Sequence, residues 1–272
     1  MNYMDYLKTQ KFPLFWCGGC GNGAVLGAIV RSFAALDYTL ENTVVVTGIG
    51  CWGKADDYLT TNSFHGTHGR ALAFATGIKL ANPKLRVIAL MGDGDGVTIG
   101  GNHFIHAARR NVDVTAILVN NFNYGMTGGQ YSGTTPENSL TSTSRYGHIE
   151  AGFDICKLAE AAGAPFVART ATDNPPAMEK LISEGLDKKG FSFIEVIAPC
   201  PTHFGRNNGM RQAAELMQWV KDKSVSVAKA KTMSPEELHD KLIMGKLVDV
   251  DGEDYGSKYL RVIASASSGN EE

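Results

Sequence analysis

The apolar residues of this chain fall into short unbroken runs that alternate with longer segments of helical length. Residues 43–47, 85–90 and 114–119 are rich in β-branched side chains and lack polar alternation, as strands buried on both faces do. Residues 71–81 form a helical segment that stops before an Asn-Pro pair, because proline disfavours a continuing helix. The alternation predicts an α/β fold with a mostly parallel sheet flanked by helices.

The same pattern continues along the chain. Further helices are predicted at residues 24–31, 98–110, 154–162, 175–189 and 210–231, and further strands at residues 166–168 and 191–197. The last of these strands completes the predicted sheet. Residues 121–149 form a long polar loop, which we interpret as a cofactor lid or a subunit contact. We expect one α/β domain over residues 1–231 and a C-terminal extension of unassigned structure over residues 232–272.

Composition narrows the class of protein. A formal net charge of −2 over 272 residues offers no electrostatic basis for binding nucleic acid or an anionic membrane. The N-terminal residues lack the pattern of a secretory leader and no apolar run approaches about twenty residues, so a cytoplasmic protein is expected. Five cysteines in a reducing compartment serve metals or catalysis more often than disulfides.

Two short motifs follow neighbouring predicted strands. Gly92-Asp93-Gly94 follows residues 85–90 after one residue, Met91, and Asn120-Asn121 comes directly after the run at residues 114–119. The carboxyl ends of parallel strands share one edge, where glycines allow backbone N–H groups to approach phosphate closely. Carboxylate and amide oxygens suit magnesium held against phosphates. A Gly-Asp-Gly turn alone is common, but the pair at this spacing resembles the thiamine-diphosphate motif, which implies that Asp93, Asn121 and the main-chain carbonyl of Asn123 bind Mg²⁺.

Four cysteines lie in loops of the predicted sheet. Cys17 and Cys20 are two residues apart beside a helix start, a spacing used by iron–sulfur clusters, by zinc sites and by redox dithiols. Cys51 and Cys200 are single residues, each in a loop after a strand. A zinc ribbon would supply a second close pair, and a dithiol would need neither single cysteine. Four thiolates converging on one edge suit a [4Fe–4S] cluster, with zinc and a dithiol as alternatives. Cys156 lies on an amphipathic segment and is interpreted as a buried inert thiol.

Together with the segments 68–71 and 124–130, these motifs resemble the β subunit of 2-oxoacid:ferredoxin oxidoreductases over about residues 12 to 210. Residues 92–96 and 100–103 are most similar to the 2-oxoglutarate branch. The resemblance implies a thiamine-diphosphate-binding fold that also carries the cluster loops. It further implies cofactor contacts by Ile49, Gly50, Cys51, Trp52, His68, Gly92, Asp93, Gly94, Asp95, Gly125, Met126 and Thr127. Physical roles follow for some of them: N–H groups of Gly94 and Asp95 for phosphate, the Thr127 hydroxyl for phosphate, and His68 as a catalytic residue beside a phosphate or a developing oxyanion.

The activity implied by the resemblance is oxidative decarboxylation of 2-oxoglutarate with coenzyme A to succinyl-CoA, CO₂ and reduced ferredoxin, or the reverse. A larger α subunit would supply the companion thiamine domain and the contacts to substrate and coenzyme A, and two heterodimers would pair. Three alternatives stay open: a pyruvate or branched-chain oxoacid enzyme, a non-redox thiamine enzyme with structural zinc, and an electron-transfer subunit without thiamine.

Overall fold

The computed structural model describes residues 1–268, and its centre is a sheet of eight strands in the order β2-β1-β3-β4-β6-β5-β8-β7. The strands are β1 Thr43–Thr47, β2 Asn62–His65, β3 Arg86–Gly92, β4 Thr115–Asn120, β5 Phe166–Ala171, β6 Ser192–Ile197, β7 Ser224–Ser226 and β8 Leu242–Asp249. Neighbouring strands are parallel except for the antiparallel pair β5–β8. The predicted α/β class with a mostly parallel sheet is therefore confirmed.

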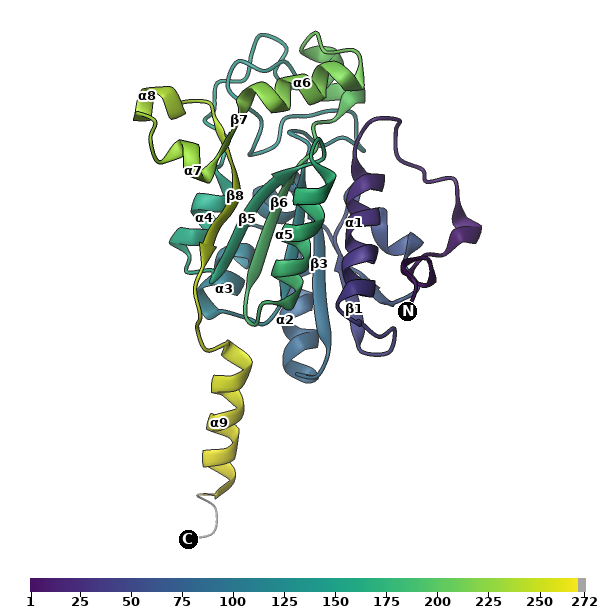
Figure 1. Cartoon of the computed structure of the whole chain (residues 1–272), viewed down its shortest axis with the longest axis vertical. Helices are drawn as coiled ribbons and strands as arrows, with labels where there is room; N and C mark the ends of the chain where they lie inside the picture. Colours follow the sequence, from purple (N-terminus) through teal and green to yellow (C-terminus); the bar gives the residue numbers. More distant parts are fainter. Residues whose placement is uncertain (269–272) are drawn as a thin grey trace.

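Helices cover both faces of this sheet (Figure 1). They are α1 Asn22–Ala35, α2 Ala71–Ala81, α3 Gly101–Arg110, α4 Ile155–Ala161, α5 Pro175–Asp187, α6 Ala213–Lys223, α7 Val227–Ala230, α8 Pro235–Leu238 and α9 Tyr255–Ser268. Short 3₁₀-helices span Tyr3–Tyr6, Thr9–Lys11 and Trp52–Tyr58, and π-helical turns span Gly94–Ile99 and Pro201–Gly205. None of the helices within residues 1–268 combines the length and apolar composition needed to span a bilayer.

Two apolar cores lie on opposite faces because successive side chains of a strand point to opposite sides. In β1, Val45 packs with α1 and α5, whereas Val44 and Val46 pack with α2 and α3. The central strands β3, β4, β5 and β6 contribute to both cores in the same way. Burial on both faces explains why these strands read as continuous apolar runs in the sequence.

The sequence prediction of the elements differs from the structure in three places. Strand β2 was not predicted, because all four of its residues are exposed and form no apolar run. The helix predicted over residues 210–231 is α6, β7 and α7: the Ser226 side chain caps α7 by accepting a hydrogen bond from Lys229 N (3.2 Å). The sheet also continues beyond β6, because β8 pairs with β5. β8 is half-buried with a bulge in its pairing and therefore lacks a strong apolar pattern. The domain boundary at residue 231 stays a prediction.

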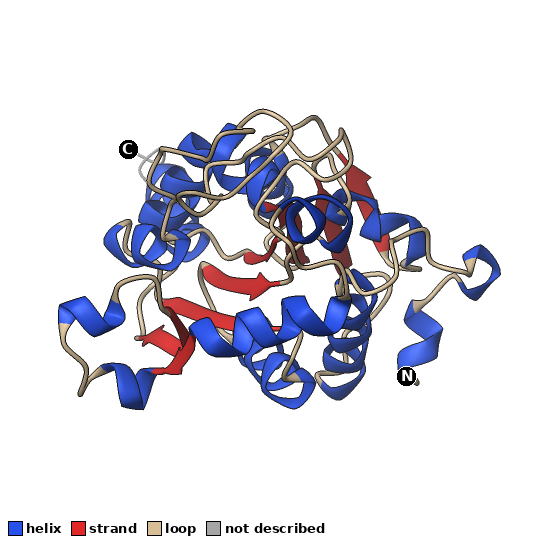
Figure 2. Cartoon of the chain, turned by 90° about the horizontal axis from the view of Figure 1, so that it is seen from above, coloured by secondary structure: helices blue, strands red, loops and turns tan. Residues whose placement is uncertain are grey.

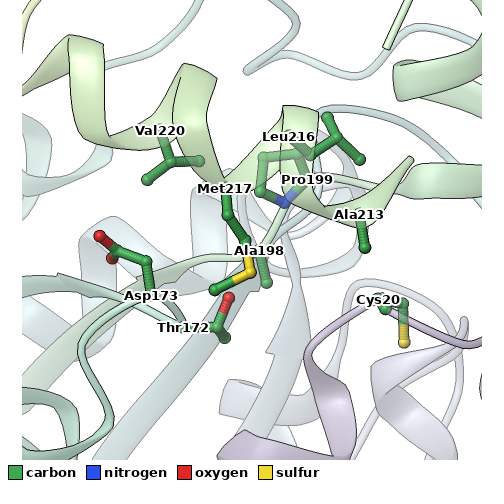
Figure 3. A pocket seen from close by; sticks show the side chains of 10 residues that line it. Cys20, Thr172, Asp173, Ala198, Pro199, Ala213, Leu216, Met217 and Val220 are labelled. Carbon is green, nitrogen blue, oxygen red and sulfur yellow. The ribbon is translucent and has the colours of Figure 1, made fainter. Parts of the chain in front are cut away.

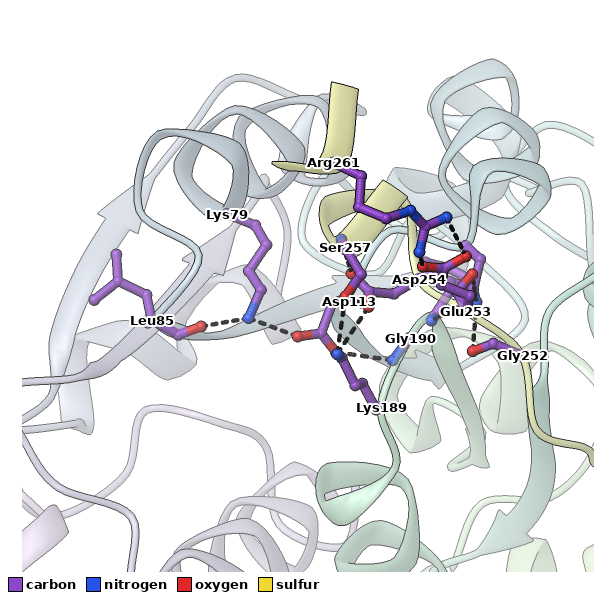
Figure 4. Close-up of polar contacts among 12 residues, drawn as sticks. Lys79, Leu85, Asp113, Lys189, Gly190, Gly252, Glu253, Asp254, Ser257 and Arg261 are labelled. Atoms are coloured by element: carbon purple, nitrogen blue, oxygen red, sulfur yellow. Dashed lines mark hydrogen bonds and ion pairs between the residues drawn. The ribbon is translucent and has the colours of Figure 1, made fainter. Parts of the chain in front are cut away.

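Helix α9 extends from the end of the sheet opposite to the carboxyl ends of the parallel strands (Figure 1). Figure 4 shows its attachment: Asp254 Oδ2 lies 3.0 Å from Lys189 Nζ, and Asp254 Oδ1 accepts from Ser257 N at 3.0 Å. Arg261 pairs with Glu253 in the same region. Polar contacts thus join the start of α9 to the loop before β6, and Tyr255 packs against the core that contains Val44 and Val46.

Candidate active site

Loops gather at the carboxyl edge of the parallel strands, the side seen from above in Figure 2. The loops after β1, β3 and β4 are neighbours because these three strands pair side by side in the sheet. They bring together Ile49–Trp52, Gly92–Asp95 and Asn121–Thr127, and the loop after β2 adds His68. Topology therefore places four separate stretches of sequence around one space.

A cavity of about 80 Å³ lies among these loops and is called here the Asp93 pocket. All twelve residues expected to contact a cofactor line it, together with Asn121, Asn123 and Tyr124. Tyr124 was missed by the sequence prediction. Its ring lies so close to Gly94 that a Cβ at this glycine would be 2.3 Å from Tyr124 Cε1, so only glycine fits there.

Asp93 is the most deeply enclosed acid in this pocket, with 1% of its surface exposed. Its Oδ2 accepts hydrogen bonds from the hydroxyls of Ser132 (2.6 Å) and Thr134 (2.7 Å). Burial raises the pKa of this carboxyl, and the two hydroxyls oppose that rise. Because both partners are neutral, a bound cation would supply the opposite charge that a buried carboxylate needs. Sequence reasoning missed Ser132 and Thr134, since they lie in the polar loop without any distinguishing motif.

The Asp95 side chain has a role that the sequence did not reveal. Its Oδ1 accepts from His68 Nδ1 (2.6 Å), Gly69 N (2.7 Å) and Ile49 N (3.2 Å). One carboxylate oxygen thus holds the loops after β1 and β2 against the start of the π-helical turn. His68 uses Nδ1 for this contact, which leaves its Nε2 for a ligand; in the neutral ring, a proton on Nδ1 makes Nε2 an acceptor.

Several polar atoms of the Asp93 pocket are buried without a hydrogen-bond partner among the described residues. They are Asp95 Oδ2 and both side-chain atoms of Asn123, Oδ1 and Nδ2. Buried polar groups in folded proteins are nearly always paired, so unpaired atoms lining a cavity fit a site that a polar ligand completes. The residues present therefore fit a charged cofactor with a cation.

The asparagine pair has divided roles. Asn121 Oδ1 accepts from Asn123 N (3.2 Å), which shapes the turn and leaves a further lone pair on the same oxygen. Asn120 is turned away into the protein, where its Nδ2 donates to Glu195 Oε1 (2.8 Å) and its Oδ1 faces Thr134 Oγ1 (3.0 Å). Of the pair, only Asn121 therefore lines the Asp93 pocket.

A second cavity of about 80 Å³, the cysteine cavity, is lined by Cys17, Cys20, Cys51 and Cys200. The structure thus brings together the four cysteines selected from the sequence. The cysteine cavity shares Cys51, Asn121 and Gly125 with the Asp93 pocket, so the two cavities adjoin. Within residues 1–268, no group of three or more His, Cys, Asp or Glu side chains is gathered tightly enough for a single metal ion.

The four thiols differ in exposure. Cys17 is exposed, Cys20 and Cys51 are half-buried, and Cys200 is buried. Burial, together with the neighbouring cysteines, raises the pKa of Cys51 to about 11, and burial likewise raises that of Cys20. Such thiols stay protonated at neutral pH unless a metal deprotonates them, which does not suit a reactive dithiol.

Neighbouring contacts hold the cysteine loops in place. Trp16 Nε1 donates to Cys51 O (2.6 Å), and Cys200 Sγ accepts from His203 N (3.4 Å). Helix α6 covers the outer side, where Cys20 and residues of this helix border a small cavity (Figure 3). A Cβ at Gly19 would lie 2.5 Å from Ala213 Cβ, so the loop and the helix are in direct contact.

Cys156 lies elsewhere, on α4, and is 1% exposed with its Sγ 3.3 Å from Glu195 Oε2. Burial raises its pKa well above the usual range of a thiol. The prediction that it is a buried residue on a helix is confirmed.

Comparisons with known proteins agree with this architecture. The family "Thiamine pyrophosphate enzyme, C-terminal TPP binding domain" matches residues 42–196. The 2-oxoglutarate synthase subunit KorB of Methanocaldococcus jannaschii is 44% identical over 97% of this chain and 98% of the relative. That of Archaeoglobus fulgidus is 56% identical over 74% of this chain and 75% of the relative.

Among solved structures, 2-oxoglutarate:ferredoxin oxidoreductase from Magnetococcus marinus, with 2-oxoglutarate, coenzyme A and succinyl-CoA bound, has a TM-score of 0.87 and 27% identity. The similarity covers 98% of this chain and 91% of that chain. The family resemblance drawn from the cysteines, the Gly-Asp-Gly turn and the asparagine pair is confirmed. This chain belongs to the thiamine-pyrophosphate-binding enzymes and, within them, to the family of the 2-oxoglutarate synthase subunit KorB.

Proposed function

We propose that this chain is the thiamine-binding β subunit of a 2-oxoacid:ferredoxin oxidoreductase acting on 2-oxoglutarate. The reaction converts 2-oxoglutarate and coenzyme A to succinyl-CoA and CO₂ while ferredoxin is reduced, or runs in reverse. The observation that carries the proposal is the adjacency of the two cavities, which share Cys51, Asn121 and Gly125. An enzyme that passes electrons from a thiamine site to a cluster needs the two sites side by side.

The Asp93 pocket is the proposed thiamine diphosphate site. When bound, the cofactor supplies the stabilisation of carbanion character that decarboxylation requires. Asp93, the free lone pair of Asn121 Oδ1 and the main-chain carbonyl of Asn123 would hold Mg²⁺ against the diphosphate. The N–H groups of Gly94 and Asp95 open a helical turn, where backbone donors have no partner within the helix and are available to phosphate.

Two side chains have more specific roles in this proposal. His68, held by Asp95 through Nδ1, would bind a phosphate or a developing oxyanion through Nε2 in its doubly protonated form, in which both ring nitrogens donate. Thr127 now donates its hydroxyl to Gln130 Oε1 (2.8 Å), so a contact to phosphate requires this hydroxyl to change its acceptor.

The cysteine cavity is the proposed site of a [4Fe–4S] cluster held by Cys17, Cys20, Cys51 and Cys200. The thiols surround a cavity, which fits a cluster of several iron and sulfide ions better than zinc, whose four ligands meet at about 2.3 Å from one point. Cys51 lines both cavities and would therefore lie on the shortest route for an electron leaving the thiamine site. A cytoplasmic location is part of the proposal, because reducing compartments keep such thiols free.

A partner α subunit is proposed to complete the active site. Thiamine enzymes use a carboxylate against the aminopyrimidine ring, and it comes from a second, homologous domain. Ile49 and Met126, which line the Asp93 pocket, are 37% and 47% exposed, so a covering α subunit would bury two apolar side chains at this site. We also propose ferredoxin as the electron carrier and a dimer of two αβ pairs as the assembly.

Turnover measurements test the proposed activity. The chain purified anaerobically with its α subunit should reduce a low-potential acceptor only when 2-oxoglutarate and coenzyme A are both present. The isolated chain, supplied with thiamine diphosphate and Mg²⁺, should be inactive. Sustained reduction by the isolated chain would contradict the shared active site. A higher kcat/KM for pyruvate than for 2-oxoglutarate would assign the enzyme to the pyruvate branch.

Paired cysteine variants test the cluster. Cys200→Ser should lose iron and visible absorbance, because it removes one ligand from the cysteine cavity. Cys156→Ser is the control, since this thiol lies on α4 beside Glu195 and lines neither cavity. Equal iron content in the two variants would remove Cys200 from the ligand set.

A further inference from the structure

The Asn123 side chain is buried but has no hydrogen bond within residues 1–268. It is 3% exposed, and neither Oδ1 nor Nδ2 has a partner. Burying an unpaired carboxamide is costly, so a protein retains one only where something compensates for it. Asn120, three residues earlier, shows the ordinary arrangement: its Nδ2 and Oδ1 are both engaged. The free carboxamide of Asn123 therefore calls for a partner from outside the chain.

The position of this carboxamide identifies the side from which a partner would reach it. A Cβ built on Gly125 would lie 3.4 Å from Asn123 Oδ1 and 3.5 Å from both Asn121 Nδ2 and Cys51 Sγ. These three groups thus surround one point at the boundary between the two cavities. Asn121 and Cys51 line both cavities, whereas Asn123 lines only the Asp93 pocket. A ligand of Asn123 is accordingly expected in the Asp93 pocket and not among the cysteines.

We propose that the side chain of Asn123, and not only its main-chain carbonyl, binds the diphosphate end of the thiamine cofactor. Nδ2 donates to an anionic phosphate oxygen, and Oδ1 accepts from a water molecule of the magnesium ion, which keeps several waters in such sites. This inference rests on the proposed function of the Asp93 pocket. It adds a side-chain contact to a position where the family motif requires only backbone.

Replacing Asn123 with leucine should change two properties in opposite directions. Asn123→Leu keeps the approximate volume but removes both unpaired polar atoms, so the cofactor-free chain should melt a few degrees higher in temperature. The same variant should bind magnesium thiamine diphosphate about tenfold to a hundredfold more weakly, because a hydrogen bond to a charged phosphate is lost. A side chain that only filled space would not combine these two effects.

The binding measurements use the complex with its α subunit, stripped of cofactor by a chelator, and titrate it by calorimetry. Magnesium pyrophosphate serves as a second probe, since it carries the diphosphate without the rings. Affinity for both probes should fall by a similar factor in Asn123→Leu. Asn102→Leu, on the exposed face of α3, is the matched control and should leave both affinities unchanged.

Three results would overturn the inference. If Asn123→Leu binds thiamine diphosphate as tightly as the wild type, the Asn123 side chain only fills space. Weaker binding of thiamine diphosphate with unchanged binding of pyrophosphate would place the contact at the rings. If the leucine variant fails to fold, Asn123→Ala removes the same two polar atoms and should weaken the binding of both probes; unchanged affinity there would also refute the contact. A wild-type complex that binds no thiamine diphosphate would instead contradict the proposed function itself.

Discussion

Glu195→Gln, which replaces one carboxylate oxygen with an NH₂ group, should strongly destabilise this protein. Arg169 Nε donates to Glu195 Oε2 at 2.7 Å, with the two side chains only 5% and 2% exposed. Desolvation by itself would lower the pKa of Arg169, but the carboxylates of Glu195 and Asp154 raise it well above its usual range, so the guanidinium stays charged. Glutamine would leave that charge next to only one carboxylate, Asp154, whose side chain is 35% exposed.

The loss of a hydrogen bond adds to the electrostatic cost of removing the charge of Glu195. Glu195 accepts from Arg169 through one oxygen and from Asn120 Nδ2 through the other, at 2.8 Å. Glutamine offers one oxygen and one NH₂ group, so in either orientation an NH₂ group faces a donor. Breaking a buried ion pair by removing one partner costs about 3–5 kcal/mol. We expect about 3 kcal/mol for Glu195→Gln, the lower end of that range, because Asp154 still faces Arg169.

Urea denaturation of the full chain measures this cost, and the protein contains a matched control. Arg31 Nε lies 2.5 Å from Glu179 Oε2, the same pair of atoms, but these side chains are 40% and 37% exposed. Glu179→Gln should therefore cost at most about 1 kcal/mol, and added salt should reduce that cost further. Equal free energies of unfolding for the two glutamine variants would refute the argument that burial decides the value of the ion pair.

Two further predictions concern the cysteine loop and the attachment of α9. Gly19→Ala should lower the free energy of unfolding by about 1–3 kcal/mol, because Gly19 has φ +81° and a Cβ there would strike Ala213. The same variant should lower the iron content of anaerobically purified protein. Gly18→Ala is the control and should leave the iron content unchanged, because Gly18 has open space around it. Burial tends to raise the pKa of Asp254, but hydrogen bonds from Ser257 and the charge of Lys189 outweigh burial and lower this pKa to about 2. A lowered pKa contributes stability that is present above about pH 4 and is lost as pH falls through about 2. Hydrogen exchange of α9 should therefore accelerate between these two pH values. Asp254→Asn should abolish this pH dependence.

Local sequence was enough to predict the central parallel strands and the ligand edge. Strands β1, β3 and β4 are buried on both faces, so each leaves an unbroken β-branched run that needs no tertiary information to recognise. Gly92-Asp93-Gly94 and the asparagine pair follow directly from those strand ends. Strand β2 could not be predicted in this way, because its exposed residues are held by pairing with β1 and leave no apolar pattern.

The partners of the site residues depended on the tertiary structure. Ser132 and Thr134 bind Asp93 across 39 and 41 positions of the chain, and nothing in their local sequence separates them from the other polar residues of the loop. Asp95 looked like a backbone contact, yet its carboxylate orients His68 across 27 positions. Such contacts arise when the sheet brings separate loops to one edge, and hydrogen bonds of this range carry no local periodicity.

The cysteines show both what local sequence can predict and what only the tertiary structure decides. Residue type and spacing identified Cys17, Cys20, Cys51 and Cys200 as the candidates and set Cys156 apart, because a thiol in a glycine-rich or strand-end loop differs locally from one on an amphipathic helix. Their shared cavity was decided by topology: Cys51 follows β1 and Cys200 follows β6, two strands separated in the sheet by β3 and β4. Sequence determines which chemical groups are present and which strand ends carry them, whereas strand order and loop packing decide which of those groups meet, because parallel pairing joins residues that are far apart along the chain.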